Sequence, residues 1–468
     1  MKITRLDAGW NMAATVLRIA SGVIVLPLVI RLLPPEEVGL WSIFLSVGAL
    51  GYLLDFGFGQ TFTRNTAYVF SGVEELKPEG YVSVREGSAV NYALLGGLIA
   101  AMRSFYRRMA LGLLILLLSG GTLYLRAVLR DYQGDHATIY MAWVLYGFLV
   151  SYQLMTLYYD ALLMGRGYVR RMKQVVILAQ LAQIVVVSIA LLSGLGLLSM
   201  VLGQIVSVVL NRILAHLVFF DVPLQRSLQG KALPVSHILP VITTNAVKVG
   251  ITSLGAFLVN RSAVFIGSLY LPLSAIGSFG ITKQMTDLLA GVSLIWFSTF
   301  YPNMIALRVR DDFLSMKRLY IKSRIFFIGF FALGSCVLLL LGNPVLVLLG
   351  GHTLFLDMPL FVLLLLVVFL ENQHAMAGGV LLTENKVPYF RAAIVSGLMT
   401  LGLLFVFLEW TTLGLAGMIL APGFSQAVYQ NWKWPLQVKR ELKISLREYP
   451  ETLKRLYRFR KEWFNTGN

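Results

Sequence analysis

Three cationic side chains stand far from the ends of long apolar stretches of this 468-residue chain: Arg18, Lys248 and Lys283. Each lies roughly eight to eleven residues from the nearer end of its stretch, which is ~12–16 Å along a helix. A charge at that depth in a membrane is costly and is usually retained for a function. Because ammonium and guanidinium groups bind anionic oxygens by charge-assisted hydrogen bonds, we predict that these three residues line a cationic, substrate-binding cleft.

Two of these cations also have a structural interpretation. The long side chain of Arg18 could extend to the nearer membrane surface. Lys283 could be neutralised by Asp287, which lies four residues further along the same expected helix. Both interpretations stay open at the level of the sequence.

Four further titratable residues lie at depth and are predicted to line the cleft or couple transport to an ion: Asp55, Asp287, Glu371 and His374. Asp55 could pair with Arg18 or bind a cation, and His374 could relay protons or form a structural hydrogen bond. The polar run 371–374 cannot face lipid with all its side chains, so part of it should face the cleft or another helix. The sequence is compatible with a Na⁺ gradient, an H⁺ gradient or the membrane potential as the energy source of such coupling.

Catalytic and metal motifs are missing from the sequence. It has no Ser/His/Asp set, nucleotide-binding loop or His/Glu metal motif. The single cysteine, Cys336, excludes an internal disulfide and a multi-cysteine metal site. We therefore predict a protein that is not an enzyme, with no catalytic residue, metal or cofactor.

Twelve apolar stretches must position these residues. The chain is 57% apolar and 13% charged, whereas soluble proteins are about half apolar and a quarter charged. Stretches of about 20 residues fit helices that cross ~30 Å of hydrocarbon, and their continuous apolar pattern argues against strands. The sequence thus predicts an all-α integral membrane protein. The expected spans are 10–32, 38–62, 105–127, 138–163, 172–193, 196–219, 237–262, 272–300, 322–341, 357–381, 388–408 and 411–430.

The distribution of Lys and Arg predicts the orientation. Most of the 40 basic residues lie at the two ends of the chain and in alternate loops. The opposite loops hold only Arg31, Arg126, Arg130 and Arg261. By the positive-inside rule, both termini are expected in the cytoplasm of a cell whose cytoplasmic (inner) membrane holds the protein. The net charge of +17 is therefore not a sign of nucleic-acid binding.

An internal repeat predicts three regions. Residues 33–41 resemble 271–279, and residues 196–202 resemble 414–420, at equivalent positions in the two halves. We expect two six-helix lobes around a central cleft, over 1–233 and 234–434. The rest, 435–468, is expected to be a basic amphipathic tail that lies on anionic lipid or docks a partner.

The segment 17–64 resembles the opening of bacterial polysaccharide transporters. The resemblance rests on Leu26-Pro27, on Arg31-Leu32-Leu33-Pro34-Pro35-Glu36-Glu37-Val38-Gly39-Leu40-Trp41, on Leu54-Asp55-Phe56-Gly57-Phe58-Gly59 and on Arg64. These proteins are the O-antigen and capsule repeat-unit flippases of the multidrug/oligosaccharidyl-lipid/polysaccharide exporter superfamily. The resemblance implies twelve helices in two lobes and essential cations in the first helix, where Arg18 stands. The extended loop 73–86 departs from the family pattern and has no assigned role.

The resemblance also implies a function. Such flippases move undecaprenyl-pyrophosphate-linked units of O-antigen, capsule or exopolysaccharide from the cytoplasmic to the periplasmic leaflet by alternating access. The resemblance therefore implies that Arg18, Lys248 and Lys283 hold the phosphates of this substrate. Expected partners are this lipid-linked oligosaccharide, the bilayer, and a glycan polymerase with its chain-length machinery, but no nucleic acid. The alternatives are a cation-coupled drug antiporter of the same superfamily and, less well supported because the outer loops are short, a membrane glycan polymerase.

Overall fold

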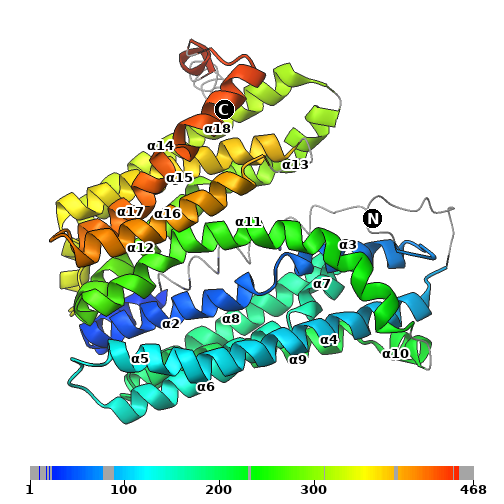
Figure 1. Cartoon of the computed structure of the whole chain (residues 1–468), viewed down its shortest axis with the longest axis horizontal. Helices are drawn as coiled ribbons and strands as arrows, with labels where there is room; N and C mark the ends of the chain where they lie inside the picture. Colours follow the sequence, from blue (N-terminus) through cyan, green and yellow to red (C-terminus); the bar gives the residue numbers. More distant parts are fainter. Residues whose placement is uncertain are drawn as a thin grey trace, which may run out of the picture. The chain divides into compact units, whose positions relative to one another are not determined.

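The computed structural model describes residues 10, 17, 21, 24–76, 89–229, 233–309, 311–383, 388–445 and 447–452. Within these ranges the chain consists of helices joined by turns and short loops, and contains no strand (Figure 1). Seven helical stretches among the described residues are long and apolar enough to cross a membrane. The chain is therefore an all-α, multi-pass membrane protein, as its composition predicts.

The expected spans coincide with helices, some of which are divided or extended. Residues 24–32, the described end of the first expected span, are helical. The labelled elements are α2 (Pro35–Leu53), α3 (Phe58–Phe70), α4 (Tyr92–Leu116), the π-helical turn η1 (Leu117–Gly121), α5 (Thr122–Val128), α6 (His136–Met155), α7 (Tyr158–Gly165), α8 (Val169–Leu192), α9 (Leu198–Phe219), α10 (Val222–Leu228), α11 (Val235–Tyr270), α12 (Leu273–Ser293), α13 (Ile295–Val309), α14 (Phe313–Leu348), α15 (Met358–Leu382), α16 (Phe390–Glu409), α17 (Leu415–Ala427) and α18 (Gln430–Glu441).

Three of the expected spans are interrupted. α2 gives way to α3 at residues 54–57, where Phe56 and Gly57 have φ angles of 46° and 70°. α6 gives way to α7 at residues 156–157, and α12 to α13 at residue 294. Two successive residues in the left-handed region cannot continue a right-handed helix. Backbone groups that such a break frees inside a membrane need partners within the protein or in a water-filled cavity.

The internal repeat is visible in the backbone. α2 begins at Pro35 and α12 at Leu273, and each is followed by a break and a second helix. The aligned residues Gly39 and Gly277 lie where these helices cross, because a Cβ on Gly277 would come within 2.6 Å of the Pro35 carbonyl oxygen. Only glycine fits such a close approach of two backbones. The second pair of similar segments, 196–202 and 414–420, also shares its backbone geometry. Gly196 and Gly414 have φ angles of 52° and 50° just before α9 and α17.

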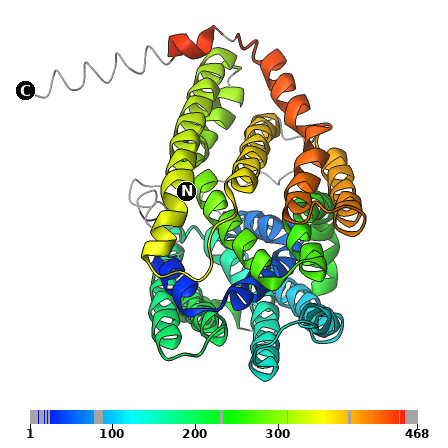
Figure 2. The same ribbon diagram turned by 90° about the vertical axis from the view of Figure 1, so that its left-hand side faces the viewer.

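The chain divides into two compact units. Unit 1 comprises Met1–Phe257, Pro272–Gly277 and Leu349–Thr353, and unit 2 comprises Leu258–Leu271, Ser278–Leu348 and Leu354–Asn468. In unit 1, α8 packs on α9, α3 on α7 and α4 on α6 (Figures 1 and 2). In unit 2, α16 packs on α17, α13 on α14 and α15 on both α17 and α18. The prediction of three regions, 1–233, 234–434 and 435–468, stays a prediction.

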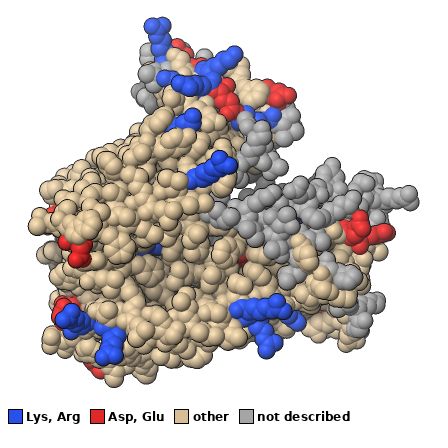
Figure 3. Space-filling view, viewed as in Figure 1, with Lys and Arg blue, Asp and Glu red and all other residues tan. Residues whose placement is uncertain are grey.

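The described start of the C-terminal tail packs on unit 2. Trp434 and Val438 of α18 and Leu442 beyond it are buried, whereas Lys439 and Arg440 are exposed. This segment is amphipathic as expected, but its apolar side is occupied by the protein itself because α18 lies against α15. In the view of Figure 3, Lys and Arg side chains gather around α18, together with Asp and Glu side chains.

Candidate functional site

Unit 2 brings three of the predicted residues together: Lys283, Asp287 and Glu371. The ammonium group of Lys283 forms an ion pair with Asp287, one turn further along α12. Glu371, near the middle of α15, accepts a hydrogen bond from Asn260 of α11, and the charges of Lys283 and Asp287 act on its carboxylate. We call these four residues the unit 2 cluster. It joins α11, α12 and α15.

Exposure shows which member of the unit 2 cluster a ligand can reach. The side chain of Asp287 is 44% exposed and that of Lys283 is 21% exposed. Asp287 takes one of the three N–H donors of the Lys283 ammonium group, so a phosphate that approaches Lys283 meets the Asp287 carboxylate beside it. Among the residues that the structure describes, no group of three or more His, Cys, Asp or Glu side chains is placed to hold a metal ion.

The polar run of α15 faces other helices, as expected for at least part of it. The side-chain amide of Asn372 donates to the Val368 carbonyl oxygen at 2.7 Å, within α15 itself. Gln373 accepts a hydrogen bond from the Arg324 guanidinium of α14 at 2.9 Å. His374 Nδ1 lies 2.7 Å from the side-chain oxygen of Asn431 in α18. His374 therefore forms a hydrogen bond between helices, and its role in ion coupling stays a prediction.

Asp55 organises a second polar cluster, in unit 1. Its carboxylate accepts hydrogen bonds from the Gly59 N–H, at 3.0 and 3.2 Å, and from the Tyr106 hydroxyl of α4, at 2.5 Å. The motif Leu54-Asp55-Phe56-Gly57-Phe58-Gly59 thus forms the break between α2 and α3, with Asp55 satisfying the first turn of α3. The contact that the sequence suggested, with Arg18, lies outside the described residues.

Sequence reasoning missed the neighbour of Asp55 in space. Arg212 of α9 is buried, and its two terminal nitrogens donate to the carboxylate oxygens of Asp160 at 2.9 and 3.3 Å. The charges of Asp55, Asp160 and Arg212 all act on the Tyr106 hydroxyl. We call Asp55, Tyr106, Asp160 and Arg212 the unit 1 cluster. The sequence did offer a signal for this cluster, because Arg212 lies seven residues from the end of the expected span 196–219.

The side chains of the other two predicted cations lie outside the part of the chain that the structure describes. Arg18 lies outside the described residues. Lys248 lies in α11, but its side chain is outside the described part of that helix. Neither can be placed beside Lys283, so the three-residue phosphate site stays a prediction.

The fold, but not the sequence, resembles known proteins. No protein-family model matches the chain, and no curated protein matches its sequence. A solved structure titled as the inward-facing conformation of a multidrug resistance MATE family transporter of the MOP superfamily aligns with a TM-score of 0.68 and 13% identity, over 92% of this chain and 94% of that one. A ligand complex of the MATE multidrug transporter DinF-BH aligns with a TM-score of 0.60 and 14% identity, over 94% and 96%. At such identities the likeness shows the fold, and the chain has the fold of the MATE transporters.

Proposed function

We propose that this protein is a flippase that moves undecaprenyl-pyrophosphate-linked oligosaccharides from the cytoplasmic to the periplasmic leaflet by alternating access of its two lobes. The fold of the MATE transporters, found over more than nine-tenths of the chain, supports a transporter of that superfamily. The observation that carries the choice of substrate is the segment 17–64, whose residues resemble the opening of the polysaccharide transporters.

Charged clusters inside the helices support this proposal. Sugar hydroxyls and a pyrophosphate cannot cross hydrocarbon unsolvated, since each unpaired polar group costs several kcal/mol there. Each unit supplies polar side chains at depth, with Lys283 and Glu371 in unit 2 and Asp55 and Arg212 in unit 1. In the proposed mechanism the headgroup passes along a polar path while the polyprenyl chain stays in the bilayer. Arg18, Lys248 and Lys283 hold the phosphates.

The unit 2 cluster suggests how a bound ion could control phosphate binding. Phosphate and Asp287 compete for the same ammonium group of Lys283. When a proton or Na⁺ neutralises Asp287 or its neighbour Glu371, Lys283 is released to bind phosphate; when the ion leaves, the pair re-forms and expels the phosphate. Ion binding and phosphate binding are thereby linked through one side chain.

The leaflet location of the lipid-linked glycan tests this function. In a deletion strain, we expect single lipid-linked units to accumulate in the cytoplasmic leaflet, where an added periplasmic glycosidase cannot reach them. Unpolymerised units in the outer leaflet would instead identify a polymerase. Export at the wild-type rate in the deletion strain would exclude the flippase.

Charge reversal at Arg18 tests the phosphate site. We expect Arg18→Glu to abolish export, because a carboxylate in the cationic path repels pyrophosphate. Arg130→Glu, at an exposed loop position, is the control and should export normally. Both variants must reach the membrane in wild-type amounts, as judged by immunoblot. Normal export by Arg18→Glu contradicts the assignment.

Drug efflux is the second candidate, because the solved structures with this fold are described as multidrug transporters. Ethidium, a fluorescent organic cation, is a suitable probe of such efflux. If drug efflux is the function, cells that lack this protein should retain ethidium while their glycans are exported normally. The flippase predicts the opposite pattern.

A further inference from the structure

Three arginines are exposed on one stretch of α4 in unit 1: Arg103, Arg107 and Arg108. We call them the α4 arginines. The first and the last are separated by ~7.5 Å along the helix axis. In the view of Figure 3, Lys and Arg side chains gather over α4 and α9, and no Asp or Glu side chain lies beside them. This surface is separate from the unit 1 cluster, whose Arg212 is buried.

The side of α4 that carries the α4 arginines continues into an apolar surface. Leu111 lies one turn beyond Arg107, Ile115 lies one turn further, and their side chains are 59% and 60% exposed. At about 100° per residue, Leu111 falls between Arg107 and Arg108 around the helix axis. Exposed apolar side chains of a spanning helix face the acyl chains, so the α4 arginines lie at the level of the headgroups. The positive-inside rule assigns this end of α4 to the cytoplasmic leaflet.

The α4 arginines have no acidic partner among the residues that the structure describes. α7 and α10 both pack against α4. However, Asp160 of α7 is paired with Arg212, and Asp221 at the start of α10 is paired with Arg166. Within the described ranges, no α4 arginine forms an ion pair or donates a hydrogen bond. The N–H groups, five on each guanidinium, are therefore open to an acceptor from outside the protein.

Aromatic rings fix the position of Arg103. Its guanidinium carbon lies 5.7 Å from the centroid of the Tyr158 ring in α7. The ring of Phe220, directly after α9, has its centroid 5.5 Å from the same carbon. Both distances fit a cation–π interaction, which holds the guanidinium but does not neutralise its charge. Arg103 thus presents a positioned, uncompensated charge where α4 meets α7 and the end of α9.

We propose that the α4 arginines bind the phosphate of an anionic phospholipid in the cytoplasmic leaflet, whose acyl chains lie along Leu111 and Ile115. Guanidinium groups bind phosphate oxygens by charge-assisted, frequently bidentate hydrogen bonds. Clustered basic side chains at the cytoplasmic surface of a membrane attract anionic lipid. The site opens onto the lipid-facing side of α4, which favours a lipid of the bilayer over the transported molecule. The proposal therefore holds whatever the protein transports.

Quenching of a fluorophore beside the site tests the proposal. In the full-length chain with Cys336→Ser, Leu111→Cys is labelled with a fluorophore, and the protein is reconstituted into phosphatidylcholine nanodiscs. Phosphatidylglycerol with a nitroxide on its acyl chain should quench this fluorophore about twofold or more strongly than spin-labelled phosphatidylcholine at the same mole fraction. Ile189→Cys, an exposed apolar position on α8, is the control. Both lipids should quench it equally, because no Lys or Arg occurs over 174–211.

Matched charge variants locate the effect. Arg103→Gln/Arg107→Gln/Arg108→Gln should abolish the preference for phosphatidylglycerol at Leu111. Arg107→Gln/Arg108→Gln, which keeps the ring contacts of Arg103, should lower it, and this variant decides the matter if the triple variant does not fold. Arg391→Gln, exposed at the start of α16 in unit 2, should leave the preference unchanged.

Three results would overturn the proposal. The first is equal quenching by both lipids at Leu111, and the second is a preference that the glutamine variants retain. The third is loss of the preference when a trace of undecaprenyl pyrophosphate is added, because the α4 arginines would then bind the transported lipid instead. None of these measurements depends on glycan export, so the flippase function and this lipid site can fail separately.

Discussion

At the scale of single residues, the ion pair of Lys283 and Asp287 combines the two interpretations that the sequence left open. The spacing of four residues on α12 allows the pair, and the structure forms it. The pair does not stand alone, because the charges of Lys283 and Asp287 act on Glu371 of a second helix, which a third helix holds through Asn260. A paired lysine can still be a functional lysine when its partner is exposed enough to exchange.

Variants that lack one or both members of the pair distinguish a role in stability from a role in glycan export. Asp287→Leu should lower the free energy of unfolding by about 1 kcal/mol, since Lys283 loses its partner at a partly exposed site. Lys283→Met/Asp287→Leu should recover most of that stability because no uncompensated charge remains, yet it should not export glycan. Thermal unfolding in detergent and the leaflet assay are the measurements.

A matched control comes from unit 1. Arg166 and Asp221 form an ion pair with similar exposure, 17% and 35%, at the end of α9. Arg166→Gln/Asp221→Asn should therefore change stability slightly and leave export intact. Normal export by the double variant in α12 would show that the Lys283 pair is only structural.

At the scale of elements, the C-terminal segment is fastened to the ends of unit 2 helices. Arg308 of α13 pairs with Glu441 of α18, Lys317 of α14 pairs with Glu448 at 2.6 Å, and the Arg324 guanidinium donates to the Tyr449 hydroxyl oxygen at 2.7 Å. These contacts hold the described part of the predicted amphipathic stretch against other helices of unit 2, where the apolar side chains of Val438, Leu442 and Ile444 are buried.

The ion pair of Glu448 with Lys317 predicts that the stability of the protein depends on pH. The Lys317 ammonium and the Ser445 N–H hold the pKa of the Glu448 carboxyl below its usual value of 4.5. A lowered pKa in the folded state stabilises the protein above the unfolded-state pKa, and this contribution is lost as the pH falls through the lowered value. At pH 6–7 the wild-type protein should therefore have a higher unfolding midpoint than Glu448→Gln. The difference should correspond to about 0.5 kcal/mol in the free energy of unfolding.

Unfolding midpoints of the two proteins across pH check this expectation. Their difference should vanish below the ordinary glutamate range, pH ~4. A difference that is constant over the whole range would show that Glu448 does not act through its charge. Glu451→Gln, an exposed position in the same segment, is the control and should follow the wild-type curve.

At the scale of the whole molecule, the basic loops predict one arrangement across the membrane. On a Cys336→Ser background, Asp131→Cys, between α5 and α6, should react with an impermeant maleimide in intact cells. Arg318→Cys, near the start of α14, should react only after permeabilisation, since the positive-inside rule places that end in the cytoplasm. The reverse pattern would invert the topology and the direction of transport proposed here.

The sequence alone determined the number and places of most spans and the internal repeat. Both depend on quantities that can be read along the chain: the length of apolar segments needed to cross hydrocarbon, and glycines such as Gly39 and Gly277 whose spacing recurs in the two halves. The depth of Lys283, Glu371 and Asp55 was equally accessible, because depth follows from distance to the span ends.

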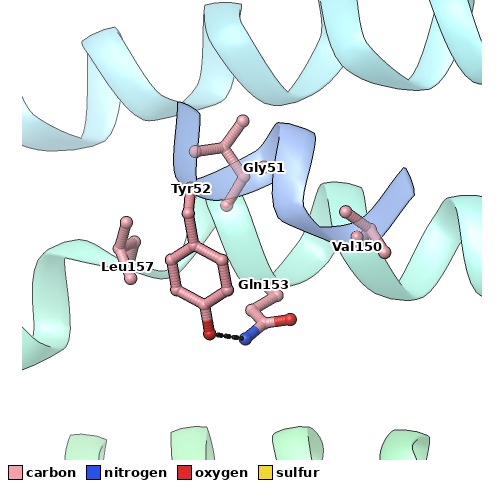
Figure 4. A pocket seen from close by; sticks show the side chains of 7 residues that line it. Gly51, Tyr52, Val150, Gln153 and Leu157 are labelled. Atoms are coloured by element: carbon pink, nitrogen blue, oxygen red, sulfur yellow. Dashed lines mark hydrogen bonds between the residues drawn. The ribbon is translucent and has the colours of Figure 1, made fainter. Parts of the chain in front are cut away.

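Only the tertiary structure decided which of these residues meet. The bonds of Arg212 to Asp160, of Glu371 to Asn260 and of Gln153 to Tyr52 (Figure 4) join different helices. A helix that is apolar on every side carries no periodicity to show which face turns toward which neighbour. Partner choice then depends on how helices pack, and packing also places the breaks of two neighbouring helices of unit 1 side by side.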